Sequence, residues 1–225
     1  MAGFLADNYQ KLLERIDKAK YRSGRTGEEI TLIAVTKGIT PEVIKEAYSL
    51  GIKNFGENRV QEVMPKMELL PPSLSWHFIG HLQSNKVKYV LPYFNLIHSL
   101  DRISLAEEIN RRAGEQDKVV DVLVQVNIAE EETKFGISTG EVEGLIKTAA
   151  QKFPYIKIKG LMTIAPYWED PESTRPVFRE LKNLSLSIKV PGVELKELSM
   201  GMTNDFEVAV EEGATMIRVG TALFK

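Results

Sequence analysis

The chain has 225 residues, of which 43% are hydrophobic and 27% charged, and its formal net charge at pH 7 is −2. This balance allows a packed core and excludes the broad basic field of nucleic-acid-binding proteins. The absence of cysteine excludes disulfides and thiolate metal sites. No apolar run approaches membrane-spanning length and no signal-peptide pattern opens the chain, so we expect a cytoplasmic protein without membrane contact.

An amphipathic helix is predicted first, because Leu5, Tyr9, Leu12 and Ile16 recur at helical spacing before Gly24. Short apolar segments then alternate with amphipathic ones. The predicted strands cover residues 30–37, 54–58, 76–80, 96–100, 119–128, 156–165, 195–201 and 215–219. The predicted helices between them cover residues 40–51, 59–70, 85–93, 104–114, 138–153, 172–188 and 204–213, and a last turn covers 220–224. No linker divides the chain, so one domain over residues 1–225 is expected.

Alternation of strands and helices favours parallel strands joined by right-handed crossovers. Eight such units predict a (β/α)8 TIM barrel with an extra N-terminal helix. The alternative is an open doubly wound sheet, which more often has a glycine-rich phosphate loop after its first strand. Here that strand ends in Lys37, and no G-x-G-x-x-G follows. The predicted capping signals are Thr40 with Pro41, Ser104 with Glu107, and Ser138 with Glu141.

Polar residues gather where the predicted strands end, which is where barrel enzymes place their chemistry. They are Lys37, Glu57, Asn58, His81, His98, Ser99, Asn127, Thr163, Ser199 and Arg218. A lysine at the tip of a buried strand is costly to desolvate unless its amine has a task, and imine formation with a carbonyl is the usual one. The alternative is that Lys37 caps the strand with its ammonium in water. Side chains alternate along a strand, so Lys37, Asn127 and Arg218 converge if Ile33, Leu123 and Met216 point inward.

Small residues follow the last two predicted strands. Ser199, Gly201, Gly220 and Thr221 offer backbone N–H groups and hydroxyls to an anion, and barrels often bind phosphate after strands seven and eight. The alternative is that the glycines are ordinary turn residues. Lys37 at the first strand end favours the phosphate interpretation, because a lysine and a phosphate cradle across a barrel mouth suit imine-linked pyridoxal phosphate.

Five segments resemble the pyridoxal phosphate homeostasis proteins, the YggS/PROSC family, whose barrel is similar to the N-terminal domain of alanine racemase. They are residues 35–37 (VTK), 54–62 (NFGENRVQE), 76–86 (WHFIGHLQSNK), 198–202 (LSMGM) and 218–221 (RVGT). The resemblance implies that Lys37 forms an aldimine with pyridoxal 5′-phosphate. It implies that Ser199, Gly220 and Thr221, with the Met200-Gly201 backbone, hold the phosphate. It further implies that Arg218 faces the pyridine nitrogen, with Asn58 and His81 beside the cofactor.

The resemblance favours a cofactor-binding protein that buffers, protects or delivers pyridoxal phosphate, rather than an enzyme. Arginine only donates hydrogen bonds, so Arg218 at the ring nitrogen would weaken the cofactor's electron sink. The related racemases also use a tyrosine from a separate C-terminal domain, and we expect no such domain after Lys225. They further use a histidine on strand six, and we expect none beside Thr163. Apo forms of enzymes that use the cofactor are candidate partners, and a monomer is expected.

Three alternatives stay open. The chain could be an amino-acid racemase that uses pyridoxal phosphate, or a Schiff-base aldolase that uses Lys37 without a cofactor. His77 and His81 could be a metal pair at helical spacing, but the segment is predicted as strand and no third ligand follows, so no metal site is expected.

Overall fold

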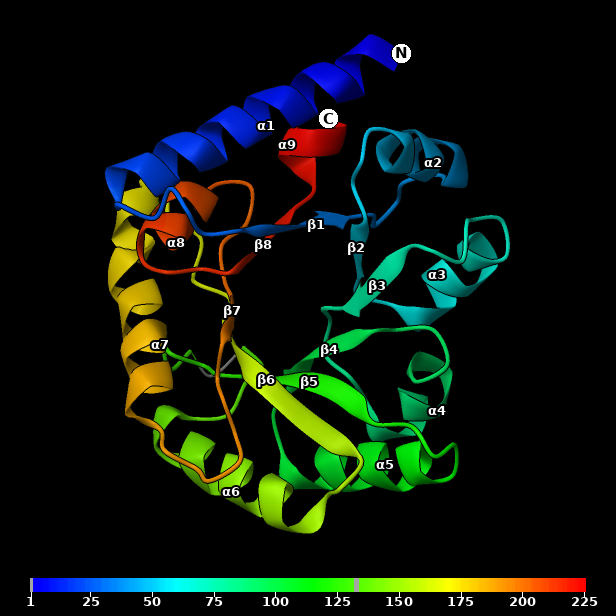
Figure 1. Cartoon of the computed structure of the whole chain (residues 1–225), viewed down its shortest axis with the longest axis vertical. Helices are drawn as coiled ribbons and strands as arrows, with labels where there is room; N and C mark the ends of the chain where they lie inside the picture. The colour runs from blue at the N-terminus through cyan, green and yellow to red at the C-terminus, as the bar shows by residue number, and fades with distance from the viewer. Residues whose placement is uncertain (1, 132–133) are drawn as a thin grey trace.

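The computed structural model describes residues 2–131 and 134–225, and in them eight parallel strands close into a barrel (Figure 1). The strands are β1 (Thr31–Val35), β2 (Asn54–Glu57), β3 (Ser75–Phe78), β4 (Leu96–Leu100), β5 (Val120–Gln125), β6 (Ile156–Met162), β7 (Glu197–Ser199) and β8 (Met216–Val219). The α-helices are α1 (Ala2–Arg22), α2 (Pro41–Ser49), α3 (Val60–Met67), α4 (Val87–Val90), α5 (Ile103–Gly114), α6 (Val142–Lys152), α7 (Arg175–Ser187), α8 (Phe206–Glu211) and α9 (Thr221–Phe224). Short 3-10 helices are η1 (Ser84–Lys86), η2 (Thr139–Glu141) and η3 (Pro171–Thr174).

Pairing between the first and last strands closes the sheet. Ile33 of β1 lies opposite Asn54 of β2 on one side and opposite Arg218 of β8 on the other. The (β/α)8 barrel with an extra N-terminal helix is therefore confirmed, and the open doubly wound alternative is excluded.

The apolar core has two parts, one inside the barrel and one between the strands and the helices. Ile33, Leu96, Leu123, Met162 and Met216 form the inner cluster. The larger cluster fills the outer layer, because every second residue of a strand faces the surrounding helices. Ile33, Leu123 and Met216 thus point inward, which was the condition for Lys37, Asn127 and Arg218 to share that face.

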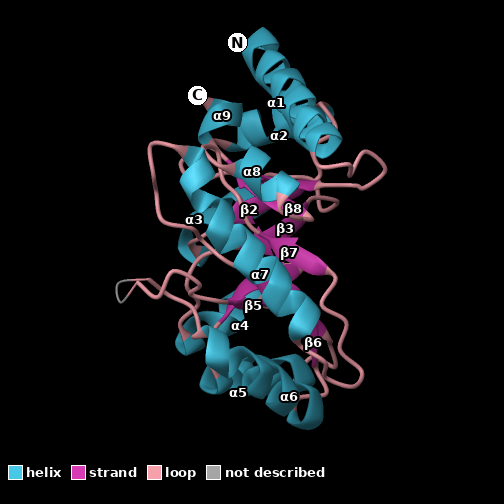
Figure 2. Cartoon of the chain, turned by 90° about the vertical axis from the view of Figure 1, so that its left-hand side faces the viewer, coloured by secondary structure: helices cyan, strands magenta, loops and turns pink. Residues whose placement is uncertain are grey.

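Helix α1 lies outside the ring of helices and packs against α8 and α9. Figures 1 and 2 both show α1 beside α9, so the two ends of the chain lie close together. Asn8 Nδ2 donates to the Leu223 carbonyl over 3.2 Å, and Arg15 pairs with Glu207 over 2.9 Å. Among the described helices, none is long and apolar enough to cross a membrane.

Two predicted capping boxes are wrong in detail. Helix α5 begins at Ile103 with Arg102 as its N-cap residue, so Ser104 lies inside the first turn. Ser138 does precede the 3-10 turn before α6, but its hydroxyl bonds to the Glu141 carboxylate and caps no backbone N–H. The predicted Thr40–Pro41 start is confirmed, although the Thr40 side chain makes no cap bond.

Candidate functional site

Lys37 lies just beyond β1 at the carboxyl end of the barrel, and its side chain is exposed. No hydrogen bond or ion pair of the described residues involves its amine. Exposure fits both interpretations of this lysine, as a solvated strand cap and as a reactive amine. The groups around it therefore have to distinguish between them.

The residue before Lys37 is held firmly from the outer layer of the barrel. The Thr36 hydroxyl donates to Glu57 Oε1 over 2.7 Å, and Lys66 Nζ of α3 donates to the Thr36 carbonyl over 2.9 Å. Lys66 Nζ also lies 2.8 Å from Glu57 Oε1, and the Glu57 side chain is 0% exposed. This Thr36–Glu57–Lys66 cluster fixes the backbone from which Lys37 extends.

Arg218 lies inside the barrel mouth as a buried cation. Its Nη1 donates to Ser199 Oγ over 2.6 Å, and its Nη2 donates to the Thr163 carbonyl over 2.8 Å. Burial lowers the pKa of Arg218 to about 10, and the charge of nearby Asp205 opposes that shift. The group therefore stays charged at pH 7, and no ion pair found in the described residues includes it. A buried cation bonded to neutral acceptors is suited to a ligand that carries negative charge or a lone pair.

Ser199 points into the barrel interior. Its Oγ accepts from Arg218 and lies 2.9 Å from His98 Nδ1. The Met200 N–H donates to the Met216 carbonyl, and the Met200 side chain is buried in the outer layer. The Ser199 hydroxyl and the Met200 N–H, for which the resemblance implied phosphate contacts, thus both have partners within the protein. These contacts hold β7 and Arg218 in place.

Two glycines shape the loops after β7 and β8. Gly201 has φ +90, and a Cβ there would lie 2.9 Å from the Phe206 Cα. A Cβ on Gly220 would lie 3.3 Å from the Val35 carbonyl, so the start of α9 lies against the strand that leads to Lys37. This contact places Gly220 and the exposed Thr221 on the same side of the mouth as Lys37.

Thr203 belongs to the same loop region, and sequence reasoning missed it. Its Oγ1 accepts from the Ala222 N–H over 3.4 Å, which joins the loop after β7 to the start of α9. The sequence signal that could have indicated Thr203 was a hydroxyl two residues beyond Gly201, in a loop where small and hydroxyl-bearing residues gather. Lys66 also escaped notice as a site residue, because its partners Glu57 and Thr36 lie on other elements, nine and 30 positions away.

Asn58 and His81 line a second part of the mouth, a pocket of about 530 Å³ after β2 and β3. The Asn58 Oδ1 atom is buried without a hydrogen-bond partner in the described structure. The His81 ring stacks on Phe135 with 3.8 Å between centroids, and its Nδ1 lies 3.4 Å from Asp101 Oδ2. These two residues therefore lie together, on the wall formed by β2 and β3.

One predicted member of the ring, and one of the two histidines considered as a metal pair, face elsewhere. Asn127 lies beyond β5, and its Nδ2 donates to the Glu131 carbonyl over 2.9 Å, so its amide faces its own loop. His77 faces the barrel interior, where its Nδ1 lies next to His98, and it does not lie beside His81. In residues 2–131 and 134–225, no group of three or more acidic or histidine side chains is placed to bind a metal.

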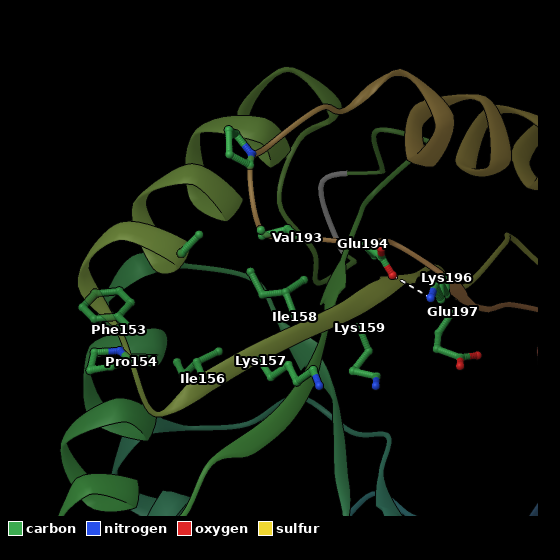
Figure 3. Close-up of a pocket in the computed structure, with 13 residues that line it drawn as sticks. Phe153, Pro154, Ile156, Lys157, Ile158, Lys159, Val193, Glu194, Lys196 and Glu197 are labelled. Carbon is green, nitrogen blue, oxygen red and sulfur yellow. Dashed lines mark ion pairs between the residues drawn. The ribbon is translucent and has the colours of Figure 1, made fainter.

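A pocket of about 460 Å³ lies at the opposite end of the strands (Figure 3). Ile156 and Lys157, at the start of β6, line it together with Glu197 at the start of β7. A Glu194–Lys196 ion pair of 2.6 Å crosses its rim. Because barrels place their chemistry at the carboxyl ends of the strands, we assign the site to the Lys37 end.

Comparison with known proteins finds relatives along the whole chain. The family model described as alanine racemase, N-terminal domain, matches residues 5–225. A protein of Aquifex aeolicus named pyridoxal phosphate homeostasis protein is 49% identical over 220 residues, which cover 97% of this chain and 96% of the relative. PipY of Synechococcus elongatus, solved with PLP bound, superposes with a TM-score of 0.84 at 34% identity, covering 98% of this chain and 100% of that one. The same protein solved without PLP gives a TM-score of 0.88 at 36% identity, with the same coverage.

Proposed function

Since this chain belongs to the family of pyridoxal phosphate homeostasis proteins, with the barrel of the alanine racemase N-terminal domain, we propose that it binds pyridoxal 5′-phosphate and takes part in its homeostasis. The observation that carries the proposal is the exposed amine of Lys37 at a barrel mouth that also holds the buried Arg218 cation. When bound, the cofactor supplies an aldehyde that forms a reversible covalent link with a primary amine.

The residues of the mouth fit that ligand. We propose that Lys37 provides the amine, and that the Gly201, Gly220 and Thr221 backbone with the Thr221 hydroxyl, beside Ser199 and Met200, holds the phosphate. The close approach of Gly220 to Val35 supports this arrangement, because it brings the two groups to one side of the mouth. Gly201 gives the neighbouring loop its turn, with Ser199 and Met200 as the strand end beneath it.

Arg218 is proposed to face the pyridine nitrogen, and Asn58 and His81 to lie beside the ring. The unpartnered, buried Oδ1 of Asn58 supports a polar contact on that wall. The Arg218 guanidinium can only donate a hydrogen bond, so it favours a ring nitrogen without a proton. That arrangement weakens the electron withdrawal on which transamination and decarboxylation depend. We therefore propose a protein that buffers, protects or delivers the cofactor without evident turnover.

The first experiment is uptake of pyridoxal phosphate followed by borohydride reduction and peptide mass analysis. We expect a reducible adduct on Lys37 and a new absorbance band in the wild type. In Lys37→Ala the adduct should disappear, while the phosphate and ring contacts still permit weaker binding. Lys45→Ala is the matched control, because Lys45 is an exposed lysine on α2. Wild-type protein with no absorbance change and no adduct would contradict the proposal.

A second experiment separates a cofactor holder from a racemase. Loaded protein is incubated with amino acids in deuterated water, and exchange of the α-proton is followed by NMR. A holder should show no exchange at turnover-like rates. A colourless protein that borohydride traps only with a carbonyl substrate would instead indicate a Schiff-base aldolase. Delivery to apo forms of cofactor-dependent enzymes, and a monomeric state, remain parts of the proposal to be measured.

A further inference from the structure

A row of five polar side chains crosses the barrel interior from β8 to β2. Arg218 Nη1 lies 2.6 Å from Ser199 Oγ, and Ser199 Oγ lies 2.9 Å from His98 Nδ1. His98 Nε2 lies 3.0 Å from His77 Nδ1, and His77 Nε2 lies 3.1 Å from Asn54 Oδ1. The row leads from Asn54, at the amino-terminal end of β2, to the Arg218 cation at the mouth. Of its members, the function proposed above gives only Arg218 a direct contact with the pyridine ring.

The two ends of this row give it a direction. The Arg218 guanidinium can only donate, and the Asn54 Oδ1 atom can only accept. If every link is a hydrogen bond, His77 donates from Nε2 to Asn54 and accepts at Nδ1 from His98 Nε2–H. His98 then accepts at Nδ1 from the Ser199 hydroxyl, which leaves a Ser199 lone pair for Arg218. Each histidine is thus a neutral imidazole with its hydrogen on Nε2.

Burial and charge keep both imidazoles neutral. Burial lowers the pKa of His77 to about 4. Burial lowers the pKa of His98 well below its ordinary value, and so do the repulsion that a second proton would meet from a protonated His77 and the charge of Arg218. Asp205 is the carboxylate near Arg218, and it accepts from the Met202 N–H rather than from a histidine. A protonated His98 would also have no lone pair for the Ser199 hydroxyl, so the row would lose its order.

We propose that His98 and His77 are positioning residues for Arg218, acting through Ser199. They hold the Ser199 hydroxyl so that its lone pair faces Nη1, while the Thr163 carbonyl fixes Nη2. A guanidinium held at two nitrogens cannot rotate about its Nε–Cζ bond without breaking both bonds. This inference deepens the proposed function and rests on it for one point, which is that Arg218 faces the pyridine nitrogen.

The first test uses cofactor-free protein. The sequence contains three histidines, so ¹⁵N-histidine NMR with single variants assigns each ring. We expect His77 and His98 to be neutral Nε2–H tautomers at pH 7, and the Arg218 Nη1 and Nη2 signals to be separate. Nδ1–H tautomers or a charged His98 would overturn the proposed direction of the row.

The second test compares two variants of His98. Asn places an oxygen near the position of Nδ1, so His98→Asn keeps an acceptor for Ser199, whereas His98→Leu removes it. We expect His98→Leu to merge the Arg218 Nη signals and to weaken pyridoxal phosphate binding about tenfold or more. His98→Asn should restore both properties to near wild-type values. Weaker binding with unchanged Arg218 signals would overturn the positioning role, because general loss of packing would then explain it.

The two proposals can fail separately. If the wild type takes up no pyridoxal phosphate but shows the expected tautomers and Arg218 signals, the proposed function is overturned and the positioning of Arg218 stands. If it binds the cofactor while the Arg218 signals are already merged, the positioning role is overturned and the proposed function stands. Should His98→Leu not fold, Ser199→Ala provides the same comparison, since it removes the hydroxyl between His98 and Arg218.

Discussion

Replacing Lys66 with methionine should show how much the Thr36–Glu57–Lys66 cluster, which fixes the backbone next to Lys37, contributes to the free energy of unfolding. The substitution keeps much of the apolar stem but removes the ammonium that lies 2.8 Å from Glu57 and 2.9 Å from the Thr36 carbonyl. Glu57 is fully buried, and its Oε2 already has no partner in the described structure. Lys66→Met would leave this carboxylate with the Thr36 hydroxyl alone.

The size of the effect follows from the burial of the two partners. Removing one partner of a buried ion pair costs about 3 to 5 kcal/mol, because the remaining charge stays buried without compensation. The Lys66 side chain is 14% exposed, so water reaches part of the site and favours the lower end of this range. We expect a loss of about 3 kcal/mol, which for a chain of this size is a drop in Tm of about 6 to 12 °C.

Thermal and urea unfolding of a four-member cycle measures this loss. The members are wild type, Lys66→Met, Glu57→Gln and the double variant, with Lys45→Met as an exposed-lysine control. The double variant should recover most of the loss, because glutamine keeps an acceptor for the Thr36 hydroxyl without a buried charge. A loss below about 1 kcal/mol in Lys66→Met, or a double variant as unstable as the single one, would refute the reasoning.

Two further predictions concern the interior and the loops. Burial lowers the pKa of His77 to about 4. Between about pH 6.5 and pH 4 the unfolded chain therefore binds a proton at His77 that the folded chain does not bind. The free energy of unfolding then falls by up to about 1.4 kcal/mol per pH unit as the pH drops through this window. Urea unfolding at several pH values should therefore show a stability gap between wild type and His77→Asn that changes over this window, and a constant gap would count against the buried neutral ring. Gly201→Ala should destabilise by about 1 to 3 kcal/mol, since φ is +90 and the new Cβ would crowd Phe206. In Gly144→Ala, in α6, the new Cβ meets nothing within 4 Å, so this variant should be more stable than the wild type by about 0.5 to 1 kcal/mol. Both variants are measured in the same melting assay, and equal effects at the two glycines would contradict the reasoning.

The fold was predictable because it depends on patterns that are local in the sequence. Alternating side chains on β1 and β8 indicated which residues share a face, and the structure shows that the face with Ile33 and Met216 is the inward one. Helix starts were less predictable. Ser104 and Glu107 match a capping box, yet the turn begins one residue earlier at Ile103. A cap motif gives a preference of about 1 kcal/mol, which packing of the helix on the barrel can override.

The candidate site was predictable only in part. Lys37 and Arg218 could be proposed because each ends a recognisable strand. Their supporting contacts could not, because Lys66 meets Glu57 across nine positions and His98 meets Ser199 across 101. No periodicity links such positions, so only the closed barrel brings them together. For the same reason the bond between Ser199 and Arg218 was not part of the sequence prediction, which gave Ser199 only a phosphate contact.

The two supports of the site lie on opposite faces of the strands. The Thr36–Glu57–Lys66 cluster holds the backbone next to Lys37 from the layer beneath α3. Ser199 and His98 hold Arg218 from the barrel interior. Both are buried polar groups, which cost stability unless every member keeps its partner. A protein that only needed to fold could fill both places with apolar side chains. Their presence beneath the two groups proposed to meet the cofactor therefore argues that the barrel gives up some stability to fix an amine and a cation at its mouth.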